Sequence, residues 1–276
     1  MANAMIGYQK GTSFYHHLSG ASKLLAFVLI SVACMISYDT RLLLFVGLFS
    51  SMMLYASHIK WHQISFVVSL VAIFALLNVV MVYLFAPQYG VEIYGHESVL
   101  IKGVGWYNLT SQELFYLLNL MLKYLCTTPL ALLFLLTTHP SQFAASLNRL
   151  GVSYKIAYAV SLTLRYIPDV QEEFQMIKRS QQARGLELSA KGRLSERIKG
   201  NLRIVTPLIF SSLERIDTVS TAMELRRFGK LPKRTWYRAQ PMQKADYVVI
   251  IVSFAILVLS FGLMFVNHGR FYNPWS

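Results

Sequence analysis

Acidic residues and cysteines are scarce in this sequence. Asp and Glu number 13 against 26 Lys and Arg, and the two cysteines, Cys34 and Cys126, both lie within apolar segments. Two such cysteines exclude a disulfide-rich secreted framework, and no Cys/His spacing of a metal site is present. The histidines are scattered, and the apolar segments hold no pair of carboxylates for a catalytic metal. A metal or catalytic centre is therefore not expected.

Motifs for nucleotide binding and hydrolysis are also lacking. The chain contains no G-x-x-x-x-G-K-[ST], H-E-x-x-H or G-x-S-x-G pattern. Because the first of these supplies the backbone N–H groups that cradle phosphates, ATP binding of the P-loop type is excluded. We expect a chain that is not an enzyme, binds no cofactor of its own and has no nucleic-acid partner.

Long apolar segments are what the sequence has in excess. Hydrophobic residues make up 55% of the chain, above the roughly 45–50% of soluble proteins. Crossing a bilayer needs about 18–20 apolar residues, so the first two of five segments require tilt or local thinning. The five segments are residues 24–38, 42–56, 64–86, 114–137 and 247–266. The sequence thus predicts an all-α, polytopic membrane protein with about five transmembrane helices.

The segment between the fourth and fifth spans, residues 139–244, is basic, with 19 Lys and Arg against 8 Asp and Glu. Because basic loops stay in the cytoplasm, this block and the N-terminus are predicted to be cytoplasmic. Only Arg41, Lys102 and Arg270 then lie outside, against 22 basic residues inside. Lys123 lies within the fourth span, where it either pairs with a nearby polar group or lines a groove for a partner helix.

Three helices are predicted within the basic block. The first covers 141–150, the second 168–184, and the third begins near residue 195 with an amphipathic stripe. The stripe comprises Ile198, Leu202, Val205, Ile209, Leu213, Ile216 and Met223. Residues 151–167 carry two charges that cost about 2.5–3.5 kcal/mol each inside a span, so this stretch is predicted to lie on the inner membrane face. Residues 87–113 show no apolar periodicity and are predicted to be a loop.

The second and third helices of the block end alike. One ends at Ala183-Arg184-Gly185 and the other at Leu225-Arg226-Arg227-Phe228-Gly229. An Arg in a last turn complements the helix dipole, and glycine is the commonest stop signal. The same arginines would also project from helix tips, where a guanidinium fork suits the carboxylates or phosphates of a partner. The residues alone leave both interpretations open.

Several motifs resemble those of the transmembrane coupling (T) component of energy-coupling factor transporters, the EcfT/CbiQ-like family of bacterial vitamin and metal importers. Residues 15–25 are similar to the family's His-Arg-Leu-Asp-Pro-x-x-Lys-Leu, with Ser19-Gly20 in place of Asp-Pro. Residues 150–153 and Leu164-Arg165-Tyr166-Ile167-Pro168 also resemble family segments. Ala183-Arg184-Gly185 matches one of two arginine motifs, and Leu225-Arg226-Arg227 stands at the other, where the family usually has Ala-Arg-Gly.

The resemblance covers nearly the whole chain and implies a non-catalytic energy-coupling subunit in the plasma membrane of a prokaryote. Its partners would be two ABC ATPase subunits, which bind ATP and Mg, a substrate-binding S component, and the lipid bilayer. The residues implied to dock onto the ATPases are Ala183, Arg184, Gly185, Leu225, Arg226 and Arg227. The apolar stripe would pack on the second helix and the inner face of the spans, and would offer the S component an apolar surface.

The register of the second motif favours Arg226 over Arg227 as the ATPase contact. Adjacent residues point about 100° apart on a helix. Arg226 continues the side that carries Met223, whereas Arg227 follows Glu224 on a polar side.

Two other functions fit parts of the sequence. A membrane-embedded enzyme acting on a lipid or prenyl phosphate could hold phosphates in basic loops, but it would need acidic pairs that the spans lack. A self-contained ABC permease would carry a single coupling helix with a Glu-Ala-Ala-like loop, which is not found. The leading interpretation divides the chain into transmembrane helices one to four (1–138), a cytoplasmic coupling-helix domain (139–244), and a fifth transmembrane helix with a short external tail (245–276).

Overall fold

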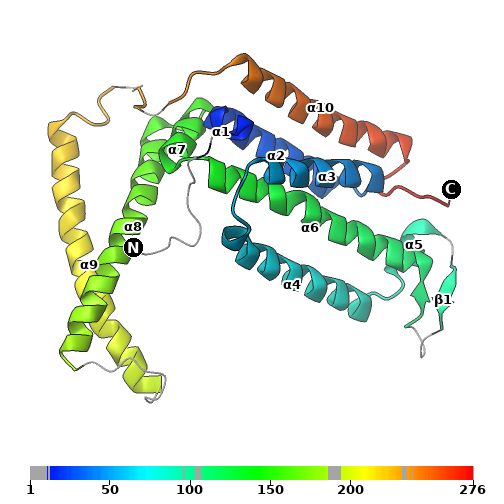
Figure 1. Ribbon diagram of the computed structural model, residues 1–276, viewed down its shortest axis with the longest axis horizontal. Coiled ribbons are helices and arrows are strands. Elements are labelled where there is room, and N and C mark those ends of the chain that lie inside the picture. The colour runs from blue at the N-terminus through cyan, green and yellow to red at the C-terminus, as the bar shows by residue number, and fades with distance from the viewer. Residues whose placement is uncertain are drawn as a thin grey trace. The chain divides into compact units, whose positions relative to one another are not determined.

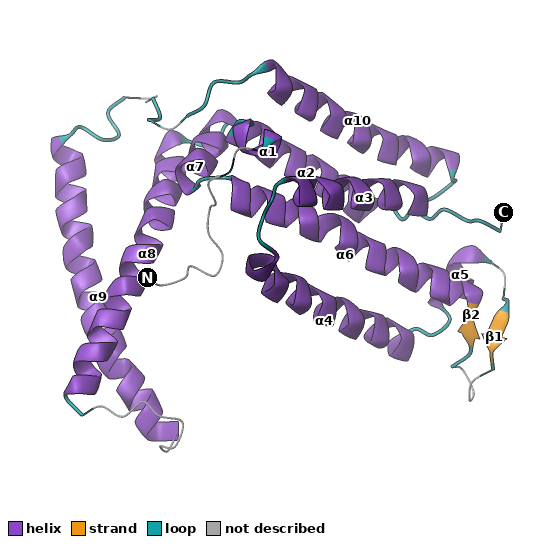
Figure 2. Ribbon diagram, viewed as in Figure 1, coloured by secondary structure: helices purple, strands orange, loops and turns teal. Residues whose placement is uncertain are grey.

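A computed structural model describes residues 11, 13–95, 97–102, 107–185, 194–231, 235–237 and 239–275, without the side chains of 194–199. Within them the chain forms ten helices and one antiparallel two-stranded sheet (Figure 1). The helices are α1 (Phe14–His17), α2 (Gly20–Ile36), α3 (Thr40–Ala56), α4 (Trp61–Phe85), α5 (Tyr89–Tyr94), α6 (Ser111–Thr137), α7 (Pro140–Arg149), α8 (Tyr154–Ala183), α9 (Leu194–Leu225) and α10 (Lys244–Val266). The strands are β1 (Val99–Ile101) and β2 (Leu109–Thr110) (Figure 2). Two compact units result: unit 1, residues 1–142 with 240–276, and unit 2, residues 143–239.

Unit 1 is built around α6. Helices α2, α3 and α4 pack on α6, and α10 packs on α2. The core between α2, α3 and α6 contains Cys34, Leu43 and Cys126, all fully buried. Helices α4, α6 and α10 are long and apolar enough to cross a membrane, and α2 and α3 are apolar helices of 17 residues, or about 25 Å each. The predicted all-α, polytopic membrane fold is confirmed.

The five apolar helices begin two to four residues before the predicted spans. The extra residues are mostly polar or small, and side chains cap four of the five helices, the exception being α4. Ser19 and Thr110 accept hydrogen bonds from backbone N–H groups three residues further on, at the starts of α2 and α6. Gln243 and Asp246 form a reciprocal capping box at the start of α10. Because capping residues are polar, hydrophobicity alone predicts the start of a span a few residues after the helix begins.

The prediction of a loop over residues 87–113 is wrong in part. This stretch contains α5 and the β1–β2 hairpin. These elements have six, three and two residues, too few to show a helical or alternating pattern. Tyr94 at the end of α5 is buried among Phe115 and Trp275, and this burial raises the pKa of Tyr94 to about 12. Aromatic packing therefore orders the segment without a periodic sequence.

Unit 2 is dominated by α8 and α9, two long helices that cross (Figure 1). The sequence predicted that a new helix begins at Pro168. Instead, α8 runs through this proline and is 30 residues long in all. A proline removes one backbone hydrogen bond, to the carbonyl four residues before it, and the remainder of the helix holds. Helix α9 passes through Pro207 in the same way. Helix α8 therefore joins the predicted surface stretch and the second predicted helix into a single rod of about 45 Å.

Candidate coupling site

The first arginine motif ends α8 as the sequence predicted. Ala183 is the last helical residue, and Arg184 is the C-cap, whose N–H donates to the carbonyl of Ser180 at 3.2 Å. Gly185 follows with φ +85°, a left-handed conformation that glycine adopts without steric cost. All three motif residues are exposed. The motif therefore presents a cationic tip at the end of a long helix.

The second arginine motif ends α9 differently from the prediction. Phe228 donates its N–H to the carbonyl of Met223, and Arg227 donates to Glu224, both at 2.9 Å. This is a Schellman ending with Arg226 as the C-cap. Its left-handed position is occupied by Arg227, with φ +55°, and not by the glycine two residues later. The comparison of Arg226 with Arg227 assumed that both residues are helical. Because α9 ends before Arg227, the angle of about 100° between adjacent helical residues does not apply to it.

Phe228 packs the end of α9 against the start of α8. Its ring centroid lies 5.5 Å from that of Tyr154 and 4.7 Å from that of Tyr158. Arg184 follows Tyr158 by 26 residues on the same helix, about 40 Å at 1.5 Å per residue. The second motif, next to Phe228, therefore lies at the start of α8, and the first lies at its end, so the two arginine motifs are at opposite ends of unit 2.

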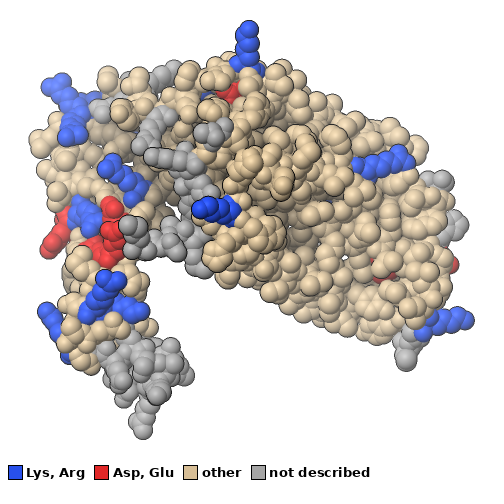
Figure 3. Space-filling model, viewed as in Figure 1, with Lys and Arg blue, Asp and Glu red and all other residues tan. Residues whose placement is uncertain are grey.

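A polar brace joins α8 and α9 where they cross. Glu173 forms an ion pair with Arg215 at 2.7 Å and accepts a hydrogen bond from Ser211. The Arg215 guanidinium also lies 5.7 Å from the ring centroid of Tyr166. The Glu173 side chain is only 16% exposed, so water screens this pair less than a surface pair. Figure 3 shows acidic and basic side chains close together over α8 and α9, and few over α4 and α6.

The predicted apolar stripe of α9 is an exposed face. Five of its residues are 37–58% exposed, namely Leu202, Val205, Ile209, Leu213 and Ile216, while Met223 is half-buried and the Ile198 side chain is outside the described residues. The stripe is therefore not the face that packs on α8. That face carries Ser211 and Arg215, in line with Ile204, Leu208 and Val219, which are buried or half-buried. Sequence periodicity missed it because two polar residues interrupt the apolar pattern.

Two buried charges in unit 1 connect the ends of α2, α6 and α10. The Asp246 carboxylate accepts hydrogen bonds from the backbone N–H groups of Ser19 and Gln243, both at 2.7 Å. Lys23 is fully buried and donates from Nζ to the carbonyl of Thr137 at 2.9 Å. An ammonium at that position complements the negative end of the α6 dipole. Lys23 lies within residues 15–25, which resemble a family segment, whereas no sequence pattern indicated a role for Asp246.

Lys123 has partners within unit 1. Its Nζ donates to the carbonyl of Met35 at 2.8 Å and lies 3.2 Å from the ring centroid of Tyr38. Of the two interpretations given above, pairing with nearby polar groups is confirmed. Among the described residues, no group of three His, Cys, Asp or Glu is arranged to hold a metal ion.

Comparison with known proteins decides the family. Residues 11–237 match the family CbiQ, described as cobalt transport protein. The chain belongs to the CbiQ family. The matched range includes both arginine motifs and every helix from α1 to α9.

Relatives of this CbiQ-family chain are named energy-coupling factor transporter transmembrane protein EcfT. The one from Streptococcus equi subsp. equi is 26% identical over 264 residues, covering 93% of this chain and 94% of the relative. The Bacillus subtilis protein is 25% identical over 272 residues, covering 95% and 99%. The Staphylococcus aureus protein is 25% identical over 265 residues, covering 92% and 94%. The resemblance to the transmembrane component of energy-coupling factor transporters, drawn from the motifs, is thereby confirmed.

Proposed function

We propose that this chain is the coupling subunit of an energy-coupling factor importer and that unit 2 connects two ABC ATPase subunits to a substrate-binding S component. The observation that carries this proposal is the placement of the two arginine motifs at opposite ends of one braced helix pair. Two ATPases can then be engaged at once, each by a helix tip. The cargo would be a vitamin or a metal ion, and the S component would bind it.

The docking segments in this proposal are the two helix ends, Ala183-Arg184-Gly185 and Leu225-Arg226-Arg227, with Arg184 and Arg226 as the side chains that contact the ATPases. Arg184, Leu225 and Arg226 are exposed, and a guanidinium forms bidentate bonds with carboxylates. Closure of the ATPases on ATP and Mg would move both tips, and a rigid rod carries such a displacement along its length. The chain itself supplies no chemistry and binds no cofactor in this role.

The exposed apolar stripe of α9 is the proposed contact for the S component. A row of large apolar side chains facing outward is costly in water and marks an interaction surface. Leu202, Ile209 and Ile216 are each more than half exposed. Unit 2 and the N-terminus would be cytoplasmic, because basic segments remain on that side.

Charge reversal at the α8 tip tests the ATPase contact. Arg184→Glu should reduce copurification of the ATPases and uptake by the whole transporter, because losing a charged interface partner costs about 2–5 kcal/mol. Arg179→Glu is the matched control, since Arg179 is exposed on the same helix five residues earlier. Stoichiometric ATPase with full uptake in the Arg184→Glu protein would refute the docking role.

A further inference from the structure

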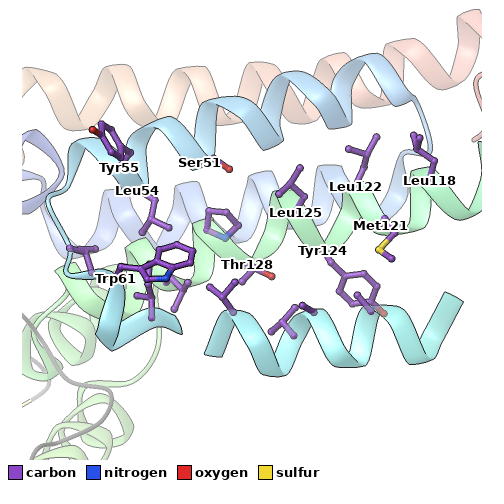
Figure 4. A pocket seen from close by; sticks show the side chains of 18 of the residues that line it. Ser51, Leu54, Tyr55, Trp61, Leu118, Met121, Leu122, Tyr124, Leu125 and Thr128 are labelled. Atoms are coloured by element: carbon purple, nitrogen blue, oxygen red, sulfur yellow. The ribbon is translucent and has the colours of Figure 1, made fainter. Parts of the chain in front are cut away.

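An apolar groove of about 980 Å³ runs along unit 1 between α3 and α4, with α6 as its floor. Figure 4 shows Leu54 of α3, Trp61 of α4 and Leu125 of α6 bordering the same space. Volumes of this size accommodate ligands of several hundred daltons. The lining is almost wholly apolar, so its occupant must be apolar over most of its length.

Two alanines of α4, Ala72 and Ala75, and Pro129 of α6 are among the residues that line the groove. Helix α4 packs on α6 near both of its ends, through Ile64 at one end and Val79 at the other. Between these contacts α4 presents Ala72 to the groove, and α6 presents Pro129. An alanine leaves a gap that a larger side chain would close. Pro129 has no backbone N–H, so it donates no helical hydrogen bond to the carbonyl of Leu125.

The dimensions of the groove fit an acyl chain. Its α4 wall extends from Trp61 to Ala75, about 21 Å at 1.5 Å per residue. One leaflet contributes about 15 Å of a hydrocarbon core of roughly 30 Å. Because α4 and α6 are both long and apolar enough to cross a membrane, the groove would open among lipid tails, and a tail can lie in it over its full length.

The α3–α4 connection at one end of the groove carries one lysine and no acidic residue. The α3–α4 turn contributes His58, Lys60 and His62, all exposed, and the sequence contains no Asp or Glu from residue 40 to residue 91. His58 and Trp61 line the groove itself. Basic residues beside a span attract anionic lipid phosphates, and Trp is enriched at the level of the headgroups. Lys60 therefore places a positive charge beside this end of the groove, which complements a phosphate that carries a negative charge.

We propose that this groove binds an anionic phospholipid, with an acyl chain between α3 and α4 and its phosphate beside Lys60 and His58. The lipid fills a gap that the chain's own side chains leave open and so fixes α4 against α6. The proposal requires only that unit 1 lies in a membrane. It is independent of the ATPase contacts, and its tests leave those contacts untouched.

Lipid retention in the purified full-length chain tests the groove. Ala72→Phe fills the groove, whereas Ile73→Phe adds the same ring at a neighbouring residue that does not line it and is 62% exposed. After extraction in a mild detergent, mass spectrometry should find bound phosphatidylglycerol with the wild type and with Ile73→Phe. Ala72→Phe should retain about tenfold less. Equal retention by the two variants would overturn the proposal.

A fluorescence measurement tests the headgroup contact and the possibility of a protein occupant. Trp61 is retained and the other three tryptophans, Trp106, Trp236 and Trp275, are replaced by Phe. In mixed vesicles, dibrominated phosphatidylglycerol should quench Trp61 more strongly than dibrominated phosphatidylcholine, and Lys60→Gln should abolish the difference. Equal quenching by both lipids in the unsubstituted turn would overturn the proposal. Protection of Trp61 from both lipids in the assembled transporter would assign the groove to a protein partner and overturn it as well.

Discussion

At the second arginine motif, two adjacent arginines have different backbone conformations. Arg226 caps α9, whereas Arg227 has φ +55°, a left-handed conformation that costs an L-residue about 1–2 kcal/mol. A non-glycine residue held there indicates that the Schellman ending and the Phe228 contact fix the chain direction. The backbone thus gives Arg227 a structural part in the turn, and leaves Arg226 as the proposed ATPase contact.

Separate substitutions distinguish the two roles. Arg226→Ala should weaken ATPase binding by about 2–5 kcal/mol, the range for a lost charged interface partner. Arg227→Gly should leave binding nearly unchanged and maintain or raise the melting temperature in detergent, because glycine relieves the positive φ. Titration of the purified chain with ATPase subunits measures the first effect, and a thermal melt measures the second. A larger affinity loss for Arg227→Gly would transfer the contact to Arg227.

Gly90 is a second position where the residue type is dictated by the backbone around it. A Cβ there would lie 2.6 Å from the backbone N and Cα of Glu113. The Gly90 N–H also donates to the Glu113 carboxylate at 2.7 Å. This close approach docks α5 onto the first turn of α6.

Gly90→Ala should therefore destabilise unit 1 by about 1–3 kcal/mol, as overpacking does. Gly262→Ala is the control, because a Cβ at Gly262 in α10 would meet no atom within 4 Å. Thermal melts of the two variants in the same detergent should differ clearly. Equal melting temperatures would mean that α5 yields without cost.

At the scale of the helices, the proposed coupling function would have a displacement pass from α8 to α9 at the point where they cross. The Glu173–Arg215 pair and the Ser211 hydrogen bond are located there. Such a pair contributes modestly to stability, on the order of 1 kcal/mol or less when partly exposed. Its loss should therefore loosen the crossing without unfolding unit 2.

Glu173→Ala should lower the uptake obtained for each ATP hydrolysed, while ATPase binding at both tips persists. Glu172→Ala is the matched control, since Glu172 is exposed and takes no part in the ion pair. Uptake and phosphate release measured in the same proteoliposomes give the ratio. An unchanged ratio with Glu173→Ala would show that the crossing does not transmit the movement.

Some features of the helices could be predicted from the sequence, and others could not. Long apolar segments predicted all five apolar helices, and the Arg-Gly pattern predicted the end of α8 at Arg184. The placement of the two arginine motifs at opposite ends of unit 2 depends on Phe228 meeting Tyr158, a contact between residues 70 positions apart, and no local pattern encodes it. The packing face of α9 was missed because its central residues, Ser211 and Arg215, are polar and bind Glu173.

For the whole molecule, the distribution of basic residues makes a prediction about orientation. Arg41, Lys102 and Arg270 are the basic residues on the predicted outer side, and 22 lie on the predicted inner side. The retention of Lys and Arg loops in the cytoplasm sets the topology of most polytopic proteins. Five spans with both arginine motifs inside require the C-terminal segment after α10 to lie outside.

Cysteine accessibility measures this orientation directly. The native Cys34 and Cys126 are fully buried, so an impermeant thiol reagent should leave the wild-type chain unlabelled in intact cells. Gly269 and Arg203 are both exposed, and a Cβ at Gly269 would meet no atom within 4 Å. Gly269→Cys should react from outside, and Arg203→Cys should react only after the cells are opened. The reverse pattern would invert the chain and place the arginine motifs where no cytoplasmic ATPase could reach them. Labelling of both from outside would require an even number of spans between the two positions, and hence one more or one fewer than α10 provides.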